Sequence, residues 1–181
     1  SGRVTISRAA RQAEFPAACQ LIAAMNPCPC GYLGHARRLC QCTPDQILRY
    51  RSKLSGPLLD RIDLHVDVPA LSDDELMGAP AAPSSAEVRA RVEGAYARAL
   101  ARQGKTNAAL GPRELDAHAP LDDAASALLR KAIGKLALSA RGHQRVLKVA
   151  RTIADLAQSD RLCAAHIGEA VRYRGNASAS S

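Results

Sequence analysis

The chain has 181 residues, of which 47% are hydrophobic and 23% are charged, a composition that fits a globular protein with one sizeable core or two small ones. No apolar run approaches the ~20 residues that a membrane-spanning helix needs, and the chain begins with Ser1-Gly2 and shows no signal peptide. We therefore expect a cytoplasmic fragment of a longer protein, with no membrane partner.

Positive charge is concentrated near the start of the chain. The net charge is +8, and residues 1–61 hold nine Arg and Lys residues against three acids. A phosphate-bearing partner would explain this asymmetry, but so would a solvated basic face. Aromatic residues are only 3% of the chain, which argues against nucleic-acid binding by base stacking.

The first quarter of the chain predicts a hairpin, a strand and a loop. Residues 3–17 begin with β-type alternation at Val4 and Ile6, so we expect a hairpin with Arg8 and Arg11 near its tip. Residues 19–26 form a short apolar run bounded by turn signals, which predicts a buried strand. The segment that follows, with its cysteines, is expected to be a loop.

Residues 43–68 predict two short helices and a strand. Thr43-Pro44-Asp45-Gln46 has the spacing of a capping box with proline in the first turn, so a helix should run from there to about Leu54. A second short helix should begin near Ser55. Residues 62–68 alternate apolar and polar side chains, which predicts a half-buried strand.

The remainder of the chain reads as a linker and a set of helices. Residues 78–85, "GAPAAPSS", form the clearest linker. Helical patterns follow at 84–104, 112–118, 122–136, 140–157 and 163–173, and residues 177–181 are expected to be a disordered tail. The fold class is therefore α/β over residues 1–77, the end of a sheet domain, followed by an all-α domain over residues 86–176.

Four cysteines have metal-ligand spacing. The pattern C-x-C-x9-C-x-C can bring four thiolates around one tetrahedral zinc, and in a reducing cytosol metal binding is favoured over disulfides. His35 is an alternative ligand, and four ordinary reduced thiols are the alternative to a metal site. Cys19 and Cys163 are apolar-flanked and are expected to be packing residues. The candidate ligands are Cys28, Cys30, Cys40 and Cys42.

Two polar residues, one at the end of a predicted strand and one at the start of a predicted helix, are candidate phosphate contacts. Asn26 ends the strand over residues 19–26 and could cap a turn, hold a catalytic water or contact a terminal phosphate. Arg141 falls in the first turn of a helix capped by Ser139, where a cation opposes the helix dipole unless an anion joins it. A solvated basic stripe continuing through Arg145 and Lys148 is the alternative.

The triplet "GKT" at residues 104–106 does not make a phosphate-binding loop. That motif needs a glycine five positions before the Gly-Lys pair, where this chain has Ala99, and it needs a preceding strand where this chain predicts a helix. Gly104 is better explained as a helix stop.

Four segments together resemble the magnesium chelatase-like AAA+ ATPases of bacteria, in particular the YifB/ComM group. They are "RVTISRA", "LIAAMNPCPCGYLG", "CTPDQILRYRSKLSGPLLDRIDLHV" and "LSARGHQRVLKVARTIADL". The resemblance runs from residue 3 to about residue 174. It implies the C-terminal part of an AAA+ sheet domain followed by a small helical lid.

The resemblance also implies roles for single residues. Asn26 matches sensor 1, Arg61 matches the arginine finger that reaches a neighbouring subunit, and Arg141 matches sensor 2. Arg8 lies where related helicases carry a pore-hairpin residue and is the first candidate for DNA contact, with Arg11 next. The four cysteines match the zinc-type loop of the family.

By the same resemblance, the whole protein would be an ATP- and Mg²⁺-dependent motor that assembles with itself into a ring, such as a hexamer, and drives branch migration of DNA in natural transformation. The chain has no G-x4-G-K-[ST] loop and no apolar strand ending in Asp-Glu. We expect these motifs upstream of Ser1 and expect this chain alone to be inactive. The alternatives are a magnesium chelatase subunit and a non-enzymatic zinc-bearing DNA-binding module.

Overall fold

The computed structural model describes residues 2–8, 11–35, 37–70, 77–78 and 82–178. It is mostly helical with one small sheet, and it consists of two compact units, Ser1–Tyr50 and Arg51–Ser181. Among the described residues, no helix has the length and apolar character needed to cross a membrane.

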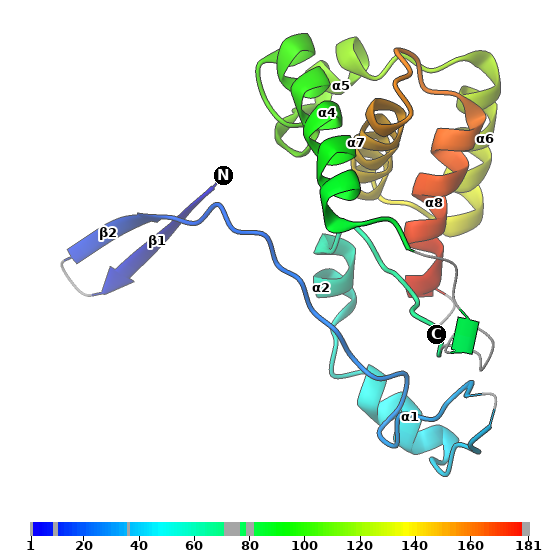
Figure 1. Ribbon diagram of the computed structural model, residues 1–181. Helices are drawn as coiled ribbons and strands as arrows, with labels where there is room; N and C mark the ends of the chain where they lie inside the picture. The colour runs from blue at the N-terminus through cyan, green and yellow to red at the C-terminus, as the bar shows by residue number, and fades with distance from the viewer. Residues whose placement is uncertain (1, 9–10, 36, 71–76, 79–81, 179–181) are drawn as a thin grey trace. The chain divides into compact units, whose positions relative to one another are not determined.

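The first unit begins with the predicted hairpin. Strands β1 (Arg3–Arg8) and β2 (Arg11–Pro16) pair antiparallel, with Arg3 opposite Pro16 and Arg8 opposite Arg11 (Figure 1). Every residue of both strands is exposed. The hairpin prediction is therefore confirmed, including the position of the two arginines at the tip.

The strand predicted over residues 19–26 is wrong for this chain. The segment is extended but belongs to no strand, and Leu21 and Ile22 are 69% and 85% exposed. A strand completes its backbone hydrogen bonds only against a neighbouring strand, and the described residues provide none beside this segment. Cys19 is exposed for the same reason, so it is not the packing residue that the sequence predicts.

Helix α1 (Pro44–Arg51) closes the first unit, and the second begins with α2 (Gly56–Arg61). The capping box before α1 is present: the Thr43 N–H donates to Gln46 Oε1 at 2.9 Å, and the Gln46 N–H donates to Thr43 Oγ1 at 3.3 Å. Helix α1 ends three residues earlier than predicted. Ser55 caps α2 by accepting from the Leu58 N–H at 3.3 Å.

The strand predicted over residues 62–68 is also absent. These residues are extended but unpaired as a strand, and Leu64, Val66 and Val68 are 48%, 64% and 88% exposed. The apolar alternation is present without the sheet that would cover it. The fold class is thus confirmed only in its coarser form, a small two-stranded sheet and a helical domain.

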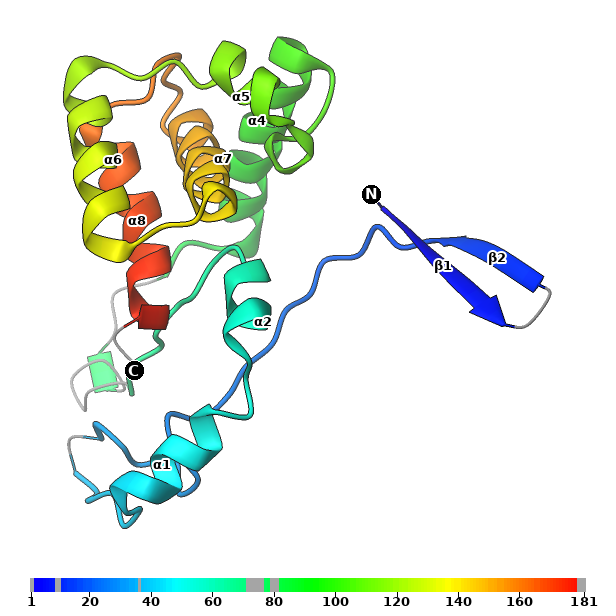
Figure 2. The same cartoon turned by 180° about the vertical axis from the view of Figure 1, so that it is seen from behind.

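The rest of the second unit is a bundle in which α7 is central, packing against α4, η1, α5 and α8, while α6 packs against α8 (Figures 1 and 2). The elements are α4 (Ser85–Gln103), the 3₁₀ turn η1 (Asn107–Ala109), α5 (Pro112–His118), α6 (Asp123–Leu136), α7 (Ala140–Leu156) and α8 (Ala164–Ser178). Helix α8 runs beyond the predicted end at 173 and into the predicted tail, whose residues 179–181 lie outside the described residues.

Local signals set the helix ends in this bundle. Ser84 and Glu87 form the predicted capping box of α4, and Gly104, at φ 71°, ends the helix as predicted. Ser139 caps α7 by accepting from the Gly142 N–H at 3.0 Å. Residues 79–81 of the predicted linker lie outside the described residues.

The core lies between α7, α8, α6 and α5. On α7, Val146 and Ala150 are fully buried, but Ala157, just after the helix, is exposed. Helix α4 buries Ala95 and Ala99, whereas its apolar residues Val88 and Val92 are 43% and 53% exposed. The buried cluster consists of Leu110, Leu115, Ala119, Ala125, Leu129, Val146, Leu147, Ala150, Ala154, Leu162, Ile167 and Ala170.

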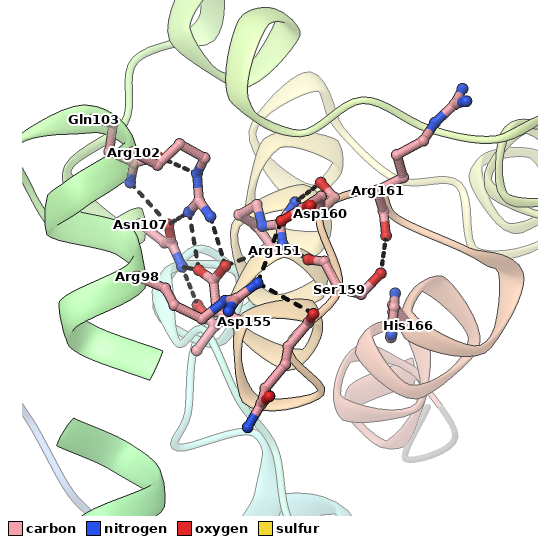
Figure 3. Close-up of polar contacts among 12 residues, drawn as sticks. Arg98, Arg102, Gln103, Asn107, Arg151, Asp155, Ser159, Asp160, Arg161 and His166 are labelled. Atoms are coloured by element: carbon pink, nitrogen blue, oxygen red, sulfur yellow. Dashed lines mark hydrogen bonds and ion pairs between the residues drawn. The ribbon is translucent and has the colours of Figure 1, made fainter. Parts of the chain in front are cut away.

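A buried polar network ties α4 and η1 to α7 (Figure 3). The Asp155 carboxylate, 1% exposed, accepts two bonds from Arg102 at 2.6 and 2.9 Å and one from Asn107 Nδ2 at 2.7 Å. It also accepts from Arg151, which is fully buried, at 3.0 Å. Arg151 donates further to the carbonyls of Ser159 and Asp160. The sequence analysis did not predict this network.

Candidate functional site

The four candidate metal ligands come together in the first unit. Cys28 is buried, and Cys30, Cys40 and Cys42 are partly buried. Their sulfur atoms all lie within 4.8 Å of one another. Gly31 and Gly34, at φ 82° and 80°, make the turns that bring the two cysteine pairs together, because only glycine adopts this region without steric cost.

The sulfur positions fit one tetrahedral zinc. Cys28 Sγ lies 3.4 Å from Cys30 Sγ and 3.7 Å from Cys40 Sγ, and the Cys30–Cys40 distance is 3.6 Å. Four thiolates on zinc at ~2.3 Å stand about 3.8 Å from each other, whereas a disulfide needs ~2.05 Å. The four thiols could therefore hold a metal ion such as zinc, and they do not pair as disulfides.

Backbone N–H groups surround the cluster and bias its charge. The N–H groups of Tyr32 and Gln41 donate to the Cys30 sulfur and lower the pKa of that thiol to about 6. Burial raises the pKa of Cys42 to about 12. Several thiolates in contact repel one another unless a cation joins them, so this arrangement favours a divalent metal.

His35 is not part of the cluster. Its Nδ1 accepts from the Arg37 and Arg38 N–H groups at 3.1 and 3.2 Å, which leaves it facing its own turn. Its ring meets Tyr32 edge-on at 5.7 Å, and the Arg38 guanidinium stacks over the same Tyr32 at 5.1 Å. Tyr32, His35 and Arg38 thus contact one another at the surface of the cysteine loop, and the alternative His35 ligand is wrong, because His35 does not lie in the cluster of the four sulfur atoms.

Asn26 immediately precedes this loop and is exposed. Its amide lies over Gly31, where an added Cβ would sit 3.8 Å from Asn26 Cγ and Nδ2. It therefore lies beside the loop that carries the candidate metal ligands of the first unit. Its sensor role stays a prediction.

The two candidate nucleotide-contacting arginines both belong to the second unit. Arg61 is the last residue of α2, and its side chain is exposed. Arg141 falls in the first turn of α7, as predicted, and is also exposed. The first turn of α7 contains no acidic residue, so its N-terminal charge is not offset locally.

Arg145 and Lys148 do not form the solvated stripe that was the alternative interpretation. Arg145 Nη1 donates to the Arg61 carbonyl and to the Asp63 carboxylate. Lys148 Nζ donates to the Ala108 carbonyl at 2.9 Å, and burial lowers its pKa. Of these three basic residues, Arg141 is exposed, whereas Arg145 and Lys148 are partly buried.

The candidate DNA contacts, Arg8 and Arg11, face each other at the hairpin tip and are both exposed. Lower on the same hairpin, Arg3 is neutralised by Glu14 at 2.7 Å. Positive charge is thus concentrated at the tip. DNA contact by these residues stays a prediction.

Sequence reasoning missed the residues that hold Arg61. Arg174 Nη2 donates to Asp60 Oδ1, and its Nη1 donates to the Ile62 carbonyl, both at 2.7 Å. More than 110 residues separate these partners in the chain. A local pattern could not have paired them.

The chain is similar to known proteins over nearly its whole length. Residues 1–76 match the family model described as magnesium chelatase, subunit ChlI, and residues 82–174 match magnesium chelatase, subunit ChlI C-terminal. The chain is 43% identical over 176 residues to the competence protein ComM of Haemophilus influenzae, covering 96% of this chain and 34% of that protein. It is 44% identical over 176 residues to YifB of Salmonella typhimurium, with the same coverage.

The chain spans about a third of the length of these relatives. The two family models cover nearly all of it and meet between residues 76 and 82. The chain therefore belongs to the magnesium chelatase ChlI family, within which ComM and YifB are its relatives.

Proposed function

We propose that this chain is the C-terminal part of an AAA+ ATPase that assembles into a ring, such as a hexamer, and moves DNA in recombination. The relative from Haemophilus influenzae is named a competence protein, and DNA uptake would be a setting for such a motor. The phosphate-binding loop and the magnesium-holding acids would belong to the part of the whole protein outside this chain.

One observation carries the nucleotide part of this proposal. Two exposed arginines lie on helices of one unit: Arg61 ends α2, and Arg141 lies in the first turn of α7. The Arg141 turn offers free backbone N–H groups and a guanidinium, which together suit a phosphate. The exposed Arg61 side chain would reach the nucleotide of the neighbouring subunit.

In the whole protein the reaction would be transfer of the γ-phosphoryl group of ATP to water, with Mg²⁺ offsetting phosphate charge. Asn26 would orient the attacking water through its amide, and Arg141 would contact the phosphates of its own subunit. Arg61 would stabilise transition-state charge in the neighbouring subunit. A finger of this kind is worth ~10³-fold or more in rate, because its charge arrives where negative charge develops.

The cysteine cluster has a structural role in this proposal. Zinc, when bound, would fix the loop between Cys28 and Cys42 through four thiolates. Asn26 precedes this loop, and α1 follows it at Pro44. The loop would thus fix the position of Asn26 relative to the helix.

DNA would be contacted by the hairpin tip. Arg8 and Arg11 carry two adjacent exposed charges, and each could neutralise one phosphate without reading sequence. Ring-shaped motors that hold DNA in this way should bind with a strong salt dependence.

The test uses the whole protein. DNA should stimulate ATP hydrolysis, and Arg61→Ala should abolish turnover while leaving DNA affinity nearly unchanged. Arg8→Ala should weaken DNA binding and its stimulation but spare basal turnover, reducing the salt slope of binding by roughly one unit. Arg3→Ala, on the same hairpin but already paired with Glu14, is the matched control. Parallel loss of both activities in the Arg8 and Arg61 variants would make the hairpin structural and refute the DNA assignment.

Two other functions give different results in the same assay. A magnesium chelatase subunit, favoured by the family description, would be stimulated by its porphyrin-inserting partners and indifferent to DNA. A zinc-bearing DNA-binding module would bind DNA tightly as this chain alone, with no nucleotide. It would also be insensitive to Arg61→Ala and Arg141→Ala.

A further inference from the structure

Arg174 of α8 donates hydrogen bonds to the two residues that flank Arg61 in the chain. We call residues 60–65 the finger segment. Arg174 Nη2 donates to Asp60 Oδ1 and Nη1 donates to the Ile62 carbonyl, each at 2.7 Å. The Arg174 side chain is only 8% exposed. A planar guanidinium that donates two charge-assisted bonds fixes orientation as well as distance, so the backbone on either side of Arg61 follows α8.

Arg145 of α7 holds the same segment at a second place. Its Nη1 donates to the carbonyl of Arg61 itself and to the Asp63 carboxylate. The Arg145 side chain is 19% exposed. A third link is backbone only, because the His65 N–H donates to the Tyr173 carbonyl at 2.9 Å. The finger segment is thus fixed to two lid helices, while the Arg61 side chain itself stays exposed.

Arg145 and Arg174, which hold the finger segment, also lie close to the first turn of α7, where Arg141 is found. Arg145 is one helical turn after Arg141 on α7. Gly142 directly follows Arg141 and is buried, and a Cβ there would lie 3.7 Å from Arg174 Nη2. The Arg174 guanidinium therefore lies between the first turn of α7 and the finger segment. In Figures 1 and 2, α2 lies at the end of the bundle where α7 begins.

We propose that Arg145 and Arg174 are positioning residues that hold Arg61 in a fixed relation to Arg141. This inference rests on the proposed function, in which Arg141 contacts the nucleotide of its own subunit and Arg61 serves the next one. A lid that shifts when Arg141 meets phosphate would then shift the finger offered to the neighbour. The two arginines would make nucleotide state in one subunit control hydrolysis in the next.

The first test asks, in this chain, whether Arg145 and Arg174 hold the finger segment in place. Amide hydrogen exchange at His65 should be slow in the wild-type chain and at least tenfold faster in Arg145→Ala and Arg174→Ala, because local opening of the finger segment exposes that N–H. Arg172→Ala, an exposed arginine on the same helix as Arg174, should leave the exchange unchanged. Equal exchange rates at His65 in all four proteins would show that Arg145 and Arg174 do not hold the finger segment.

Coupling is tested in the whole protein by mixing variants. Arg61→Ala and Arg141→Ala should each be inactive alone but regain activity when mixed, because roughly a quarter of the interfaces in a random ring then combine an intact sensor with an intact finger. Arg145→Ala should lower kcat about 10²-fold, as expected for a misplaced catalytic group, with KM changed less than about twofold. It should regain activity with Arg141→Ala and none with Arg61→Ala.

The outcomes separate the two proposals. If Arg61→Ala keeps wild-type turnover, the proposed function fails. If Arg61→Ala is inactive while Arg145→Ala and Arg174→Ala keep their kcat, only the positioning role fails. Arg145→Lys, which retains a donor and the charge, should recover part of the kcat. Loss of nucleotide binding in the Arg145 variants, or mixing behaviour that matches Arg141→Ala, would instead assign Arg145 to its own subunit's site and overturn the inference.

Discussion

Removing the carboxylate of Asp155 should destabilise the helical unit more than any surface change. Asp155→Ala deletes the acceptor of two bonds from Arg102, one from Asn107 and one from Arg151. Arg151, fully buried, would keep its charge without a carboxylate partner. Breaking a buried pair in this way costs about 3–5 kcal/mol. That is a large fraction of the ~5–15 kcal/mol that holds a typical domain folded.

Urea unfolding followed by helical circular dichroism measures the effect. With a slope of about 2 kcal/mol/M, the midpoint should fall by about 2 M. Asp160→Ala is the matched control, because Asp160 also pairs with an arginine, Arg98 at 3.3 Å, but is 97% exposed. Exposed pairs contribute little, so that midpoint should hardly move. Equal shifts for the two variants would refute the reasoning from burial.

The same network predicts a pH dependence with a definite sign. Burial alone would raise the pKa of Asp155, but the hydrogen bonds from Arg102 and Asn107 outweigh it, and the pKa lies below its ordinary value of 3.8. A carboxyl whose pKa is lower folded than unfolded stabilises fully above about pH 5 and loses that stabilisation as pH falls through the native pKa. Asp155→Asn should remove this part of the acid dependence of the urea midpoint. If the midpoint falls equally with decreasing pH in the variant and the wild type, this assignment to Asp155 is contradicted.

Three further predictions concern the metal loop, a helix cap and catalysis by this chain alone. Protein purified under reducing conditions should contain about one zinc per chain by metal analysis; Cys28→Ser should lose it, and Cys19→Ser, at an exposed thiol, should not. Ser84→Ala should cost the helical unit about 1 kcal/mol in urea unfolding, whereas Thr106→Ala, at an N-cap without a side-chain bond, should be near neutral. This chain alone should show no ATP turnover above buffer, even with DNA, and turnover that disappears in Arg61→Ala would disprove the need for further motifs.

Features with a local cause could be predicted from sequence. The capping boxes at Thr43 and Ser84, the stop at Gly104 and the position of Arg141 in the first turn of α7 each depend on residues within four positions. The cysteine cluster is local in the same sense, because the fifteen residues from Cys28 to Cys42, with two glycine turns, contain all its candidate ligands.

Features that need a distant partner could not be predicted in this way. The segments 19–26 and 62–68 have the apolar patterns of strands, yet strand formation depends on neighbours that the described residues do not contain. In the buried network, Arg151 and Asp155 are four residues apart, a spacing that places them on one face of a helix. Their partners Arg102 and Asn107 lie about fifty residues before Asp155 in the chain. The sequence pattern of α7 indicated a basic stripe through Arg145 and Lys148, but it did not indicate that the charged residues Arg151 and Asp155 are buried.

The positions of the two polar systems in the second unit indicate separate roles. The Asp155 network is buried and links α7 to α4 and η1, so it should decide whether the bundle holds together. Arg145 and Arg174 link α7 and α8 to the finger segment, and their carboxylate partners Asp63 and Asp60 are 64% and 37% exposed, so solvent reduces the contribution of these ion pairs to stability. Substitutions in the first system should therefore lower the urea midpoint and reduce every activity in proportion to the unfolded fraction. Substitutions in the second should lower the midpoint less and should reduce kcat by more than the unfolded fraction explains, because they disturb the position of Arg61 while the bundle stays folded.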